Sequence, residues 1–451
     1  MTTSKSLKGL FVAALVASAS AAVVPRSTAT NNTTNSTQLP LSSDDSFSYE
    51  LLRTASLSRS FGADTGEVLQ AAGSIIPGNL ESFSGAFNKL ANHVYSQAQA
   101  INATLDPVTA RNAFFRASTY FRSADFYLHG NGSDPRLTTF WANQTAAFNS
   151  AIALLPIPGE RITLQAASGN FSIPCIYYRA EGANATNLRP TVILGNGYDG
   201  AQEEMLHATG FDALARGYNV ITYEGPGQPT VRREQNLGFI TEWETVVTPV
   251  VDYLLSGARP EVDGSKLGLF GYSMGGFLAV RAAAFEHRLA AVFAVDGLYS
   301  VFEPYYNTLE GQVKDLWDAG NYSAFDAEVN YYLDSGMAPT ETLWSLQQGV
   351  WSFDVDTVSE FLRKAEPMTL DGGLAQQVTC PVWIGAPSED IFFPNQPEKV
   401  RDALRPGLAS YNYLTAADAA QNHCHVGAMD RVNGLIYDWF DNVIANRVDR
   451  R

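Results

Sequence analysis

Apolar and polar positions follow two different rhythms along the chain. From about residue 162 onward, short apolar runs end in glycine-rich loops and are separated by stretches of helical length and periodicity. The runs are PTVILG, NVITY, KLGLFGY, LAAVFAV, PVWIGAP and ASYNYL. Strands that alternate with helices in this way predict an α/β fold with a mostly parallel, doubly wound sheet. Functional residues are then expected in the loops beyond the carboxyl ends of the strands.

The N-terminal part of the chain has a helical rhythm instead. Between residues 47 and 153, apolar residues recur at spacings of three and four, and Pro107 stands near a helix start. We therefore expect a helical cap domain at residues 46–160, followed by the sheet-containing domain at residues 161–451.

A long segment interrupts the second half of the strand pattern. About 80 residues separate the strand that ends near Val295 from the one that starts near Pro381, which is more than one crossover connection needs. The segment has helical periodicity, so a helical lid insertion is expected at about residues 298–375.

The first residues have the pattern of a secretory signal peptide. Lys5 and Lys8 precede an apolar run and a series of small residues, which predicts a cleaved leader at residues 1–21 and no membrane anchor after cleavage. Residues 22–45 are rich in Ser, Thr and Asn, as is typical of a solvated, glycosylated linker.

The density of Asn-x-Ser/Thr sequons fits a secreted glycoprotein. A single sequon is weak evidence because the tripeptide is common by chance, but several together favour the secretory pathway. The candidate sites are Asn31, Asn32, Asn35, Asn102, Asn131, Asn143, Asn170, Asn184 and Asn321.

Charge and composition narrow the range of partners. The chain has 46 acidic and 30 basic residues among 451, a net charge of -16. Such a surface repels phosphate backbones, so nucleic acid is excluded as a partner. We expect a small-molecule substrate, and a homodimer is compatible with the sequence.

Neither a metal nor an organic cofactor is expected. The three cysteines, Cys175, Cys380 and Cys424, allow at most one intramolecular disulfide, and the sequence has no CxxC motif and no second histidine pair for a structural zinc site. The loop sequence GNGYDG lacks the spacing and the acidic residue of a dinucleotide fingerprint.

The strongest chemical signal is the sequence Gly271-Tyr272-Ser273-Met274-Gly275. This G-x-S-x-G motif lies between an apolar run and a helical stretch of small residues. In that setting the glycines permit a tight strand-to-helix turn, which projects the serine hydroxyl above the edge of the sheet. Ser273 is thus the predicted nucleophile.

A serine nucleophile needs a base to take its proton. In a fold of this type the order along the chain is nucleophile, acid, base. Of the histidines after Ser273, His287 falls at the end of the next helical stretch, whereas His423 and His425 follow the last predicted strand. The base is therefore His423 or His425.

The base in turn needs a carboxylate that holds its tautomer. Asp390 follows the penultimate predicted strand and is our first choice for the acid. Asp296, at the end of the preceding strand, is the alternative, and Glu389 ranks third.

The chemistry also requires backbone N–H groups that stabilise an oxyanion. Met274, at the start of the helix after the nucleophile, should supply one. The loop GNGYDG after the first parallel strand should supply the other, from Gly197 or Tyr198.

The ordered motifs GNGYDGAQEE, YEGPGQP, WETVVTPVVDYL, GYSMGG, PSEDIFFP and HCHVG resemble one particular family. It is the α/β-hydrolase family that includes dihydroxypseudooxynicotine hydrolase and fungal polyketide hydrolases of pigment pathways (the yellowish-green type). The resemblance extends from about residue 47 to the end and implies an α/β-hydrolase fold with a helical N-terminal cap. It maps the base onto His423, the acid onto Asp390 and the nucleophile onto Ser273.

Several functions suit these residues. The resemblance implies hydrolysis of a carbon–carbon bond in a small aromatic ketone or polyketide-like compound. The residues alone are equally compatible with a carboxylesterase, or with acyl transfer or cyclisation in secondary metabolism. A hydrolase-like binding protein without catalysis is a remote alternative, because a complete Ser-His-Asp set argues against it.

Overall fold

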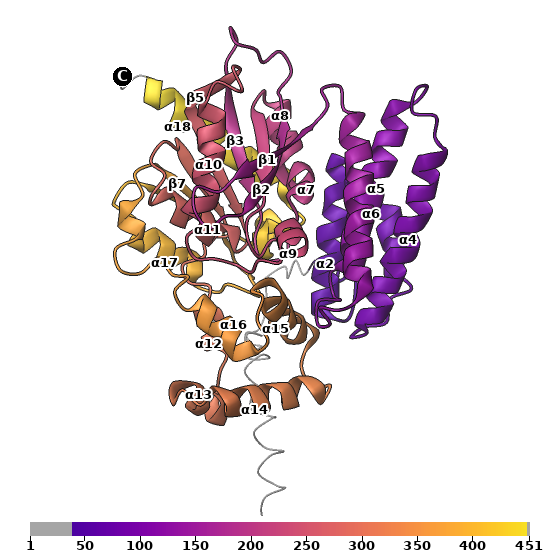
Figure 1. Cartoon of the computed structure of the whole chain (residues 1–451), viewed down its shortest axis with the longest axis vertical. Helices are drawn as coiled ribbons and strands as arrows, with labels where there is room; N and C mark the ends of the chain where they lie inside the picture. Colours follow the sequence, from indigo (N-terminus) through magenta and orange to yellow (C-terminus); the bar gives the residue numbers. More distant parts are fainter. Residues whose placement is uncertain (1–37, 449–451) are drawn as a thin grey trace, which may run out of the picture.

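The computed structural model describes residues 38–448 and contains, within that range, one eight-stranded sheet (Figure 1). The strands are β1 (Glu160–Gln165), β2 (Ser172–Tyr178), β3 (Arg189–Gly195), β4 (Asn219–Tyr223), β5 (Val262–Tyr272), β6 (Ala291–Val295), β7 (Val382–Pro387) and β8 (Ala409–Leu414). The predicted signal peptide, most of the predicted linker and the sequons at Asn31, Asn32 and Asn35 lie outside the described residues.

The sheet has the order β1-β2-β4-β3-β5-β6-β7-β8. The six predicted runs form β3 to β8, which pair in parallel with one another. Strands β1 and β2, which the apolar pattern did not predict, add an antiparallel edge. The α/β class with a mostly parallel sheet is confirmed.

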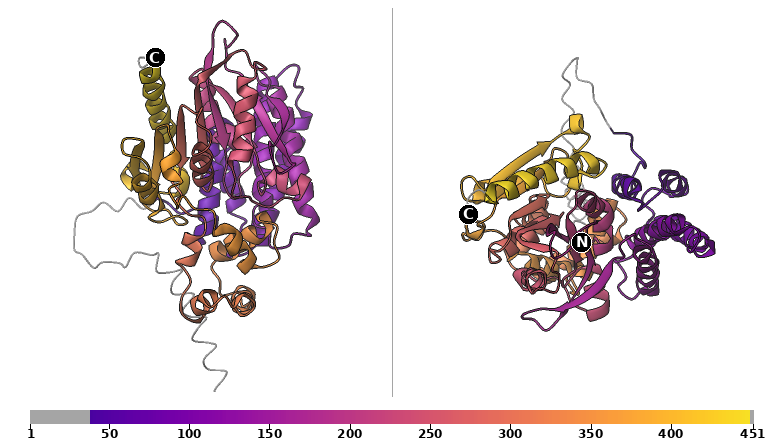
Figure 2. Two further views of the ribbon diagram at one scale, coloured as in Figure 1. Left: turned by 60° about the vertical axis from the view of Figure 1, so that its left-hand side comes forward. Right: turned by 90° about the horizontal axis from the view of Figure 1, so that it is seen from above.

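Helices cover both faces of the sheet, which explains why β4 and β6 are buried throughout. Figure 1 looks onto α10 and α11 in front of the sheet, with α18 behind it, and Figure 2 gives the same arrangement from above. The helices of this domain are α7 (Gln202–Met205), η2 (Leu206–Gly210), α8 (Phe211–Ala215), α9 (Pro229–Gln235), α10 (Glu244–Leu255), α11 (Gly275–Ala283), α17 (Gln396–Ala403), η4 (Ala416–Asp418), η5 (His423–His425) and α18 (Met429–Val448).

The N-terminal helices stand side by side next to the sheet (Figure 1). They are α2 (Asp45–Ser56), η1 (Leu57–Ser60), α3 (Thr65–Ala72), α4 (Leu80–Ala100), α5 (Pro107–Asp125) and α6 (Pro135–Ala153). Both α5 and α6 begin with an Asp-Pro pair: the aspartate side chain caps the first turn, and proline at the first helical position has no N–H to leave unsatisfied.

The segment between β6 and β7 is helical and lies beyond one end of the sheet (Figure 1). It contains α12 (Glu303–Tyr306), α13 (Gly311–Asp318), α14 (Tyr322–Asp334), α15 (Thr340–Ser352), α16 (Val358–Ala365) and η3 (Ala375–Gln377). Helix α15 touches both other parts of the molecule. The indole N–H of Trp344 donates to the carbonyl of Phe126 in the cap (3.2 Å), and the carbonyl of Ser345 accepts from the hydroxyl of Tyr198 in the loop after β3 (2.7 Å).

Two further features bear on the predictions. Among the described helices, none combines the length and the hydropathy that a bilayer span requires. No disulfide joins Cys175, Cys380 and Cys424, which all lie within the described range and are buried.

Candidate active site

The serine of the G-x-S-x-G motif occupies the sharp turn between β5 and α11. Ser273 has a φ of 60°, a left-handed conformation that costs a non-glycine residue about 1–3 kcal/mol. The flanking glycines make the turn sterically accessible. A Cβ atom at Gly271 would lie 1.9 Å from the carbonyl oxygen of Gly275, and one at Gly275 would lie 2.7 Å from the carbonyl oxygen of Asn196. The turn thus places the hydroxyl at the carboxyl edge of the sheet.

His423 and Asp390 meet this hydroxyl from two other strand ends. His423 begins the short η5 turn (His423–His425) after β8, and its Nε2 lies 2.8 Å from Oγ of Ser273. Its Nδ1 lies 3.0 Å from each carboxylate oxygen of Asp390, in the loop after β7. The backbone N–H groups of Phe392 and Phe393 donate to Oδ1 of Asp390 and fix the carboxylate. The structure therefore brings the three residues of the predicted triad together.

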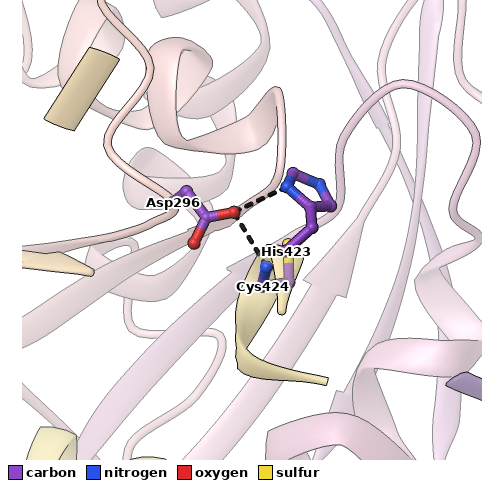
Figure 3. Close-up of side chains that lie close together, drawn as sticks. All are labelled: Asp296, His423 and Cys424. Atoms are coloured by element: carbon purple, nitrogen blue, oxygen red, sulfur yellow. Dashed lines mark hydrogen bonds and ion pairs between the residues drawn. The ribbon is translucent and has the colours of Figure 1, made fainter. Parts of the chain in front are cut away.

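The alternative acid, Asp296, reaches the same imidazole (Figure 3). Its Oδ2 lies 2.8 Å from Nδ1 of His423 and accepts a hydrogen bond from the backbone N–H of Cys424, also at 2.8 Å. The side chain of Asp296 is fully buried, and its Oδ1 has no partner within residues 38–448. The sequence offered Asp296 and Asp390 as alternatives for the acid, whereas in the structure both carboxylates lie next to Nδ1 of His423.

The pKa values of the two carboxylates shift in opposite directions. Burial and then the charge of Asp390 raise the pKa of Asp296. Burial alone would raise the pKa of Asp390 as well, but the charge of His423, its hydrogen bond and the two backbone N–H groups lower that pKa below its ordinary value. Burial opposes protonation of His423, yet Asp390 and the other nearby groups raise its pKa well above the usual range. Asp390 is therefore the carboxylate that stays charged most readily.

His425 points away from the serine. It is fully buried, its Nδ1 lies 2.7 Å from the carbonyl oxygen of Ala420, and burial lowers its pKa, which favours the neutral imidazole. Cys424 and His425 both have a φ of 54°, which turns the two side chains out of the direction that His423 takes. The order of the motifs alone left His423 and His425 open, and only the family resemblance favoured His423, which is the histidine that reaches Ser273.

Asp296, His423 and Cys424 also offer donor atoms within 4.8 Å of one another, a spacing that a metal ion could bridge. Burial raises the pKa of the Cys424 thiol to about 12, so the thiolate that a metal would bind is disfavoured. The Nδ1 of His423 is already engaged by Asp390. These observations fit the predicted absence of a metal, which stays a prediction.

The loop after β3 lies directly against the nucleophile turn. A Cβ atom at Gly197 would come within 2.8 Å of the backbone nitrogen of Met274, so only glycine permits this approach. The N–H of Gly197 donates to Oδ1 of Asn196 (2.8 Å). Within the described chain, the N–H groups of Met274 and Tyr198 have no such partner. One unpaired backbone donor thus lies in the nucleophile turn, at Met274, and another in the loop that packs against it, at Tyr198.

Aromatic rings from the loop after β7 and from the cap pack against the imidazole of His423. The centroids of the Phe392 and Phe393 rings lie 4.8 and 5.1 Å from it, and that of Tyr49 in the cap lies 6.1 Å away. Trp344 of helix α15 packs edge-on against Phe392. The surroundings of the triad are therefore largely aromatic.

Some residues around the site were not predicted. Gln348 of α15 donates to the carbonyl of Tyr198 (3.0 Å), and Gln228 of the GPGQP turn donates to the carbonyl of Asn196 (2.8 Å). Burial, and then the charge of Asp390, raise the pKa of Glu341 at the start of α15 to about 7. Only Gln228 stands in a motif that the sequence singled out; the lid residues reach the site through tertiary packing.

The described sequons lie on the surface. Asn143 is half-buried and the other five are exposed: Asn102, Asn131, Asn170, Asn184 and Asn321. This exposure is a requirement for glycosylation, and the modification itself stays a prediction.

Comparisons with known proteins bear on the family and the fold. Residues 192–445 match the model of the alpha/beta hydrolase family. Among characterised relatives, 20-hydroxy-prefusarin hydrolase FUS2 of Gibberella moniliformis is 28% identical over 420 residues, 90% of this chain and 98% of its own. Alpha/beta hydrolase gkaG of Penicillium citrinum is 30% identical over 365 residues, 77% of this chain and 82% of its own.

Among solved structures, 2,6-dihydroxy-pseudo-oxynicotine hydrolase superposes with a TM-score of 0.67 at 20% identity, over 86% of this chain and 95% of that one. At this identity the match shows the shared fold. The family resemblance seen in the motifs is confirmed, and the chain belongs to the α/β-hydrolase family.

Proposed function

We propose that the chain is a secreted serine hydrolase that acts on a small carbonyl compound. The hydrogen-bonded series Ser273–His423–Asp390 is the observation that carries this proposal. A serine hydroxyl is a weak nucleophile unless a base accepts its proton, and Nε2 of His423 lies in position to do so. Asp390 holds the Nδ1 proton on the opposite side of the ring and stabilises the imidazolium as it forms.

The reaction then runs in two halves. Oγ of Ser273 attacks the carbonyl carbon while its proton passes to Nε2 of His423. The N–H groups of Met274 and Tyr198 stabilise the resulting oxyanion; Tyr198 is favoured over Gly197 because the Gly197 N–H is engaged by Asn196. The imidazolium protonates the leaving group, and a water molecule, deprotonated by His423, releases the acyl group from Ser273.

We further propose that the leaving group is carbon, so that the enzyme hydrolyses a carbon–carbon bond in an aromatic or polyketide-like ketone. Two similar proteins are named as hydrolases of 20-hydroxy-prefusarin and of 2,6-dihydroxy-pseudo-oxynicotine. The aromatic surroundings of His423 suit a flat, conjugated substrate whose carbanion is delocalised. Ester hydrolysis uses the same groups and is the second candidate.

A fluorophosphonate probe tests the nucleophile. We expect covalent labelling of Ser273 in the wild-type protein and none in Ser273→Ala, with peptide mass spectrometry to locate the adduct. Labelling of another residue, or activity that survives in Ser273→Ala, would contradict the proposal. Product mass spectrometry on matched ketone and ester substrates separates the two reactions.

Secretion has its own test. A native protein that carries N-glycans loses mass on endoglycosidase treatment, and an unchanged mass would argue against the secretory assignment.

A further inference from the structure

Two carboxylates, where a catalytic triad needs one, contact the imidazole of His423. Asp390 comes from the loop after β7 and Asp296 from the end of β6, and each has an oxygen within 3.0 Å of Nδ1 of His423. Both side chains are almost completely excluded from solvent. A buried carboxylate at this distance stabilises a neighbouring cation strongly, so Asp296 must influence His423.

The position of Asp296 is set by its backbone. The peptide is pressed against the nucleophile turn: the carbonyl of Val295 accepts from the N–H of Ser273, and a Cβ atom at Gly276 would come within 1.8 Å of the carbonyl oxygen of Asp296. The side chain therefore projects from a rigid part of the sheet. The same strand end thus places both the serine turn and the second carboxylate.

Asp296 also supports the strained turn that carries the histidine. Its Oδ2 accepts from the N–H of Cys424, a residue held at a φ of 54°. The hydroxyl of Tyr272 donates to the carbonyl of the same residue (3.1 Å). These two bonds hold Cys424 through both its N–H and its carbonyl and orient the preceding imidazole.

We propose that Asp296 is a second acid partner of His423: a positioning residue that shares the Nδ1 proton with Asp390 and holds it when Asp390 is neutralised. This inference rests on the proposed function. In an enzyme with one acid, an asparagine in place of that acid offers an N–H to the imidazole, selects the wrong tautomer and costs roughly 10⁴-fold in rate. In the Asp390→Asn variant, the backbone N–H groups of Phe392 and Phe393 would hold the amide oxygen at the Oδ1 position and so place the amide NH₂ group at the Oδ2 position. Both positions lie 3.0 Å from Nδ1 of His423, so the NH₂ group opposes a proton on Nδ1, whereas Asp296 still accepts that proton with a full negative charge.

A double-mutant cycle tests the proposal, with the rate of fluorophosphonate labelling of Ser273 as the measurement. We expect Asp390→Asn to lose about 10- to 100-fold, Asp296→Asn less than about 10-fold, and the double variant roughly 10⁴-fold, more than the product of the single losses. The Asp296→Asn variant keeps a side-chain oxygen for the Cys424 N–H. Asp296→Ala removes that acceptor as well, so the difference between Asp296→Ala and Asp296→Asn measures the support of the turn.

Proton NMR gives a second readout that a purely structural role would not change. The downfield signal of the His423 Nδ1 proton should persist in Asp390→Asn and disappear in the double variant. A loss of roughly 10⁴-fold in Asp390→Asn alone, or a double variant no slower than the product of the singles, would overturn the inference. If an Asp296 variant fails to fold, Asp390→Asn still decides by both readouts.

The same experiment separates the two proposals. If the wild-type protein is not labelled at Ser273, the proposed function fails. If the wild-type protein is labelled but Asp390→Asn loses roughly 10⁴-fold in labelling rate, only the proposed role of Asp296 fails.

Discussion

The loop after β3 adjoins two buried ionic clusters, through Asp199 in one and through the contact of Gly197 with the nucleophile turn in the other, and the two clusters differ in their cationic or basic side chains. The triad cluster consists of Asp296, Asp390 and His423, with two carboxylates around one imidazole. The cap-contact cluster consists of Arg53, Arg122, Glu50, Asp199 and Glu204, with three carboxylates around two guanidinium groups. In both clusters the carboxylates outnumber the nitrogen bases, yet only the imidazole of the triad cluster, and neither guanidinium group, can exchange a proton near neutral pH.

The cap-contact cluster joins the N-terminal helices to the sheet domain. Arg53 of α2 makes a bidentate pair with Glu204 of α7 (2.7 and 2.6 Å) and a third bond to Asp199 (2.7 Å). Arg122 of α5 pairs with Glu50 and reaches Asp199 at 3.2 Å. Because guanidinium stays protonated in proteins, these charges are permanent and the cluster acts as a fixed connection.

The comparison shows how a fixed cluster can serve a titratable one. Asp199 directly follows Tyr198, whose N–H is a proposed oxyanion donor, so the arginines hold the backbone next to the site. The imidazole of His423 can gain and lose a proton and is suited to catalysis. Removal of His423 from the triad cluster should therefore lower the reaction rate. Removal of an arginine from the cap-contact cluster should lower the stability of the fold.

The largest effect on rate is expected for His423→Ala. Without the base, labelling of Ser273 by fluorophosphonate should fall by at least about 10⁴-fold. The free energy of unfolding should fall by less than about 2 kcal/mol, because Asp296 can take up a proton and so avoid a second buried negative charge once the imidazole is gone. His425→Ala is the matched control and should keep a measurable rate; the reverse result would assign the base to His425.

The largest effect on stability is expected for Arg53→Ala. The change leaves Glu204 and Asp199 buried without their main cation, which should lower the free energy of unfolding by about 3–5 kcal/mol in denaturant titrations. Arg59→Ala is the control, since Arg59 also pairs with two carboxylates, Asp212 and Asp430, but is partly exposed to solvent. It should cost about 1 kcal/mol or less. Equal losses would mean that the cap-contact cluster behaves like a surface pair.

The contrast also explains what the sequence could predict. The strands β3 to β8, the serine turn and the positions of Asp390 and His423 were predictable because each depends on a local motif at a strand end. That Asp296 and Asp390 reach one nitrogen depends on how two strand ends converge. The cap-contact cluster depends on the packing of α2 and α5 against the sheet domain. Neither leaves a local pattern, because isolated Arg and Glu residues on a helix have the appearance of a solvated face.

A third prediction concerns the pH dependence of the cap-contact cluster. Burial alone would raise the pKa of Glu204, but Arg53 and Arg122 lower it to about 2 from an ordinary value of 4.5. A lowered pKa gives stability that is present above pH 4.5 and lost as the pH falls toward 2, roughly 3 kcal/mol in all. Glu50 in the same cluster acts in the opposite direction, because burial raises its pKa.

The variant Glu204→Gln isolates this contribution. Its deficit in the free energy of unfolding against wild type should be largest at pH 7 and should shrink between about pH 4.5 and the lowest pH at which both proteins fold. Glu160→Gln, at the exposed pair with Arg259, should show a small deficit that hardly changes with pH. A constant deficit in Glu204→Gln would mean that its charge is not the source of the stability.

The smallest effect should appear where the two clusters meet, at Asp199. Asp199→Asn keeps the shape of the side chain but removes a negative charge that both Arg53 and Arg122 contact. The loop that carries Tyr198 should then be held less firmly, and labelling of Ser273 should slow by less than about 10-fold, or about 1.4 kcal/mol in transition-state stabilisation. Glu203→Gln removes a carboxylate of the next helix that pairs with Arg161 instead and should leave the rate unchanged. If Asp199→Asn also leaves the rate unchanged, the fixed cluster joins the cap to the sheet domain without supporting the oxyanion loop.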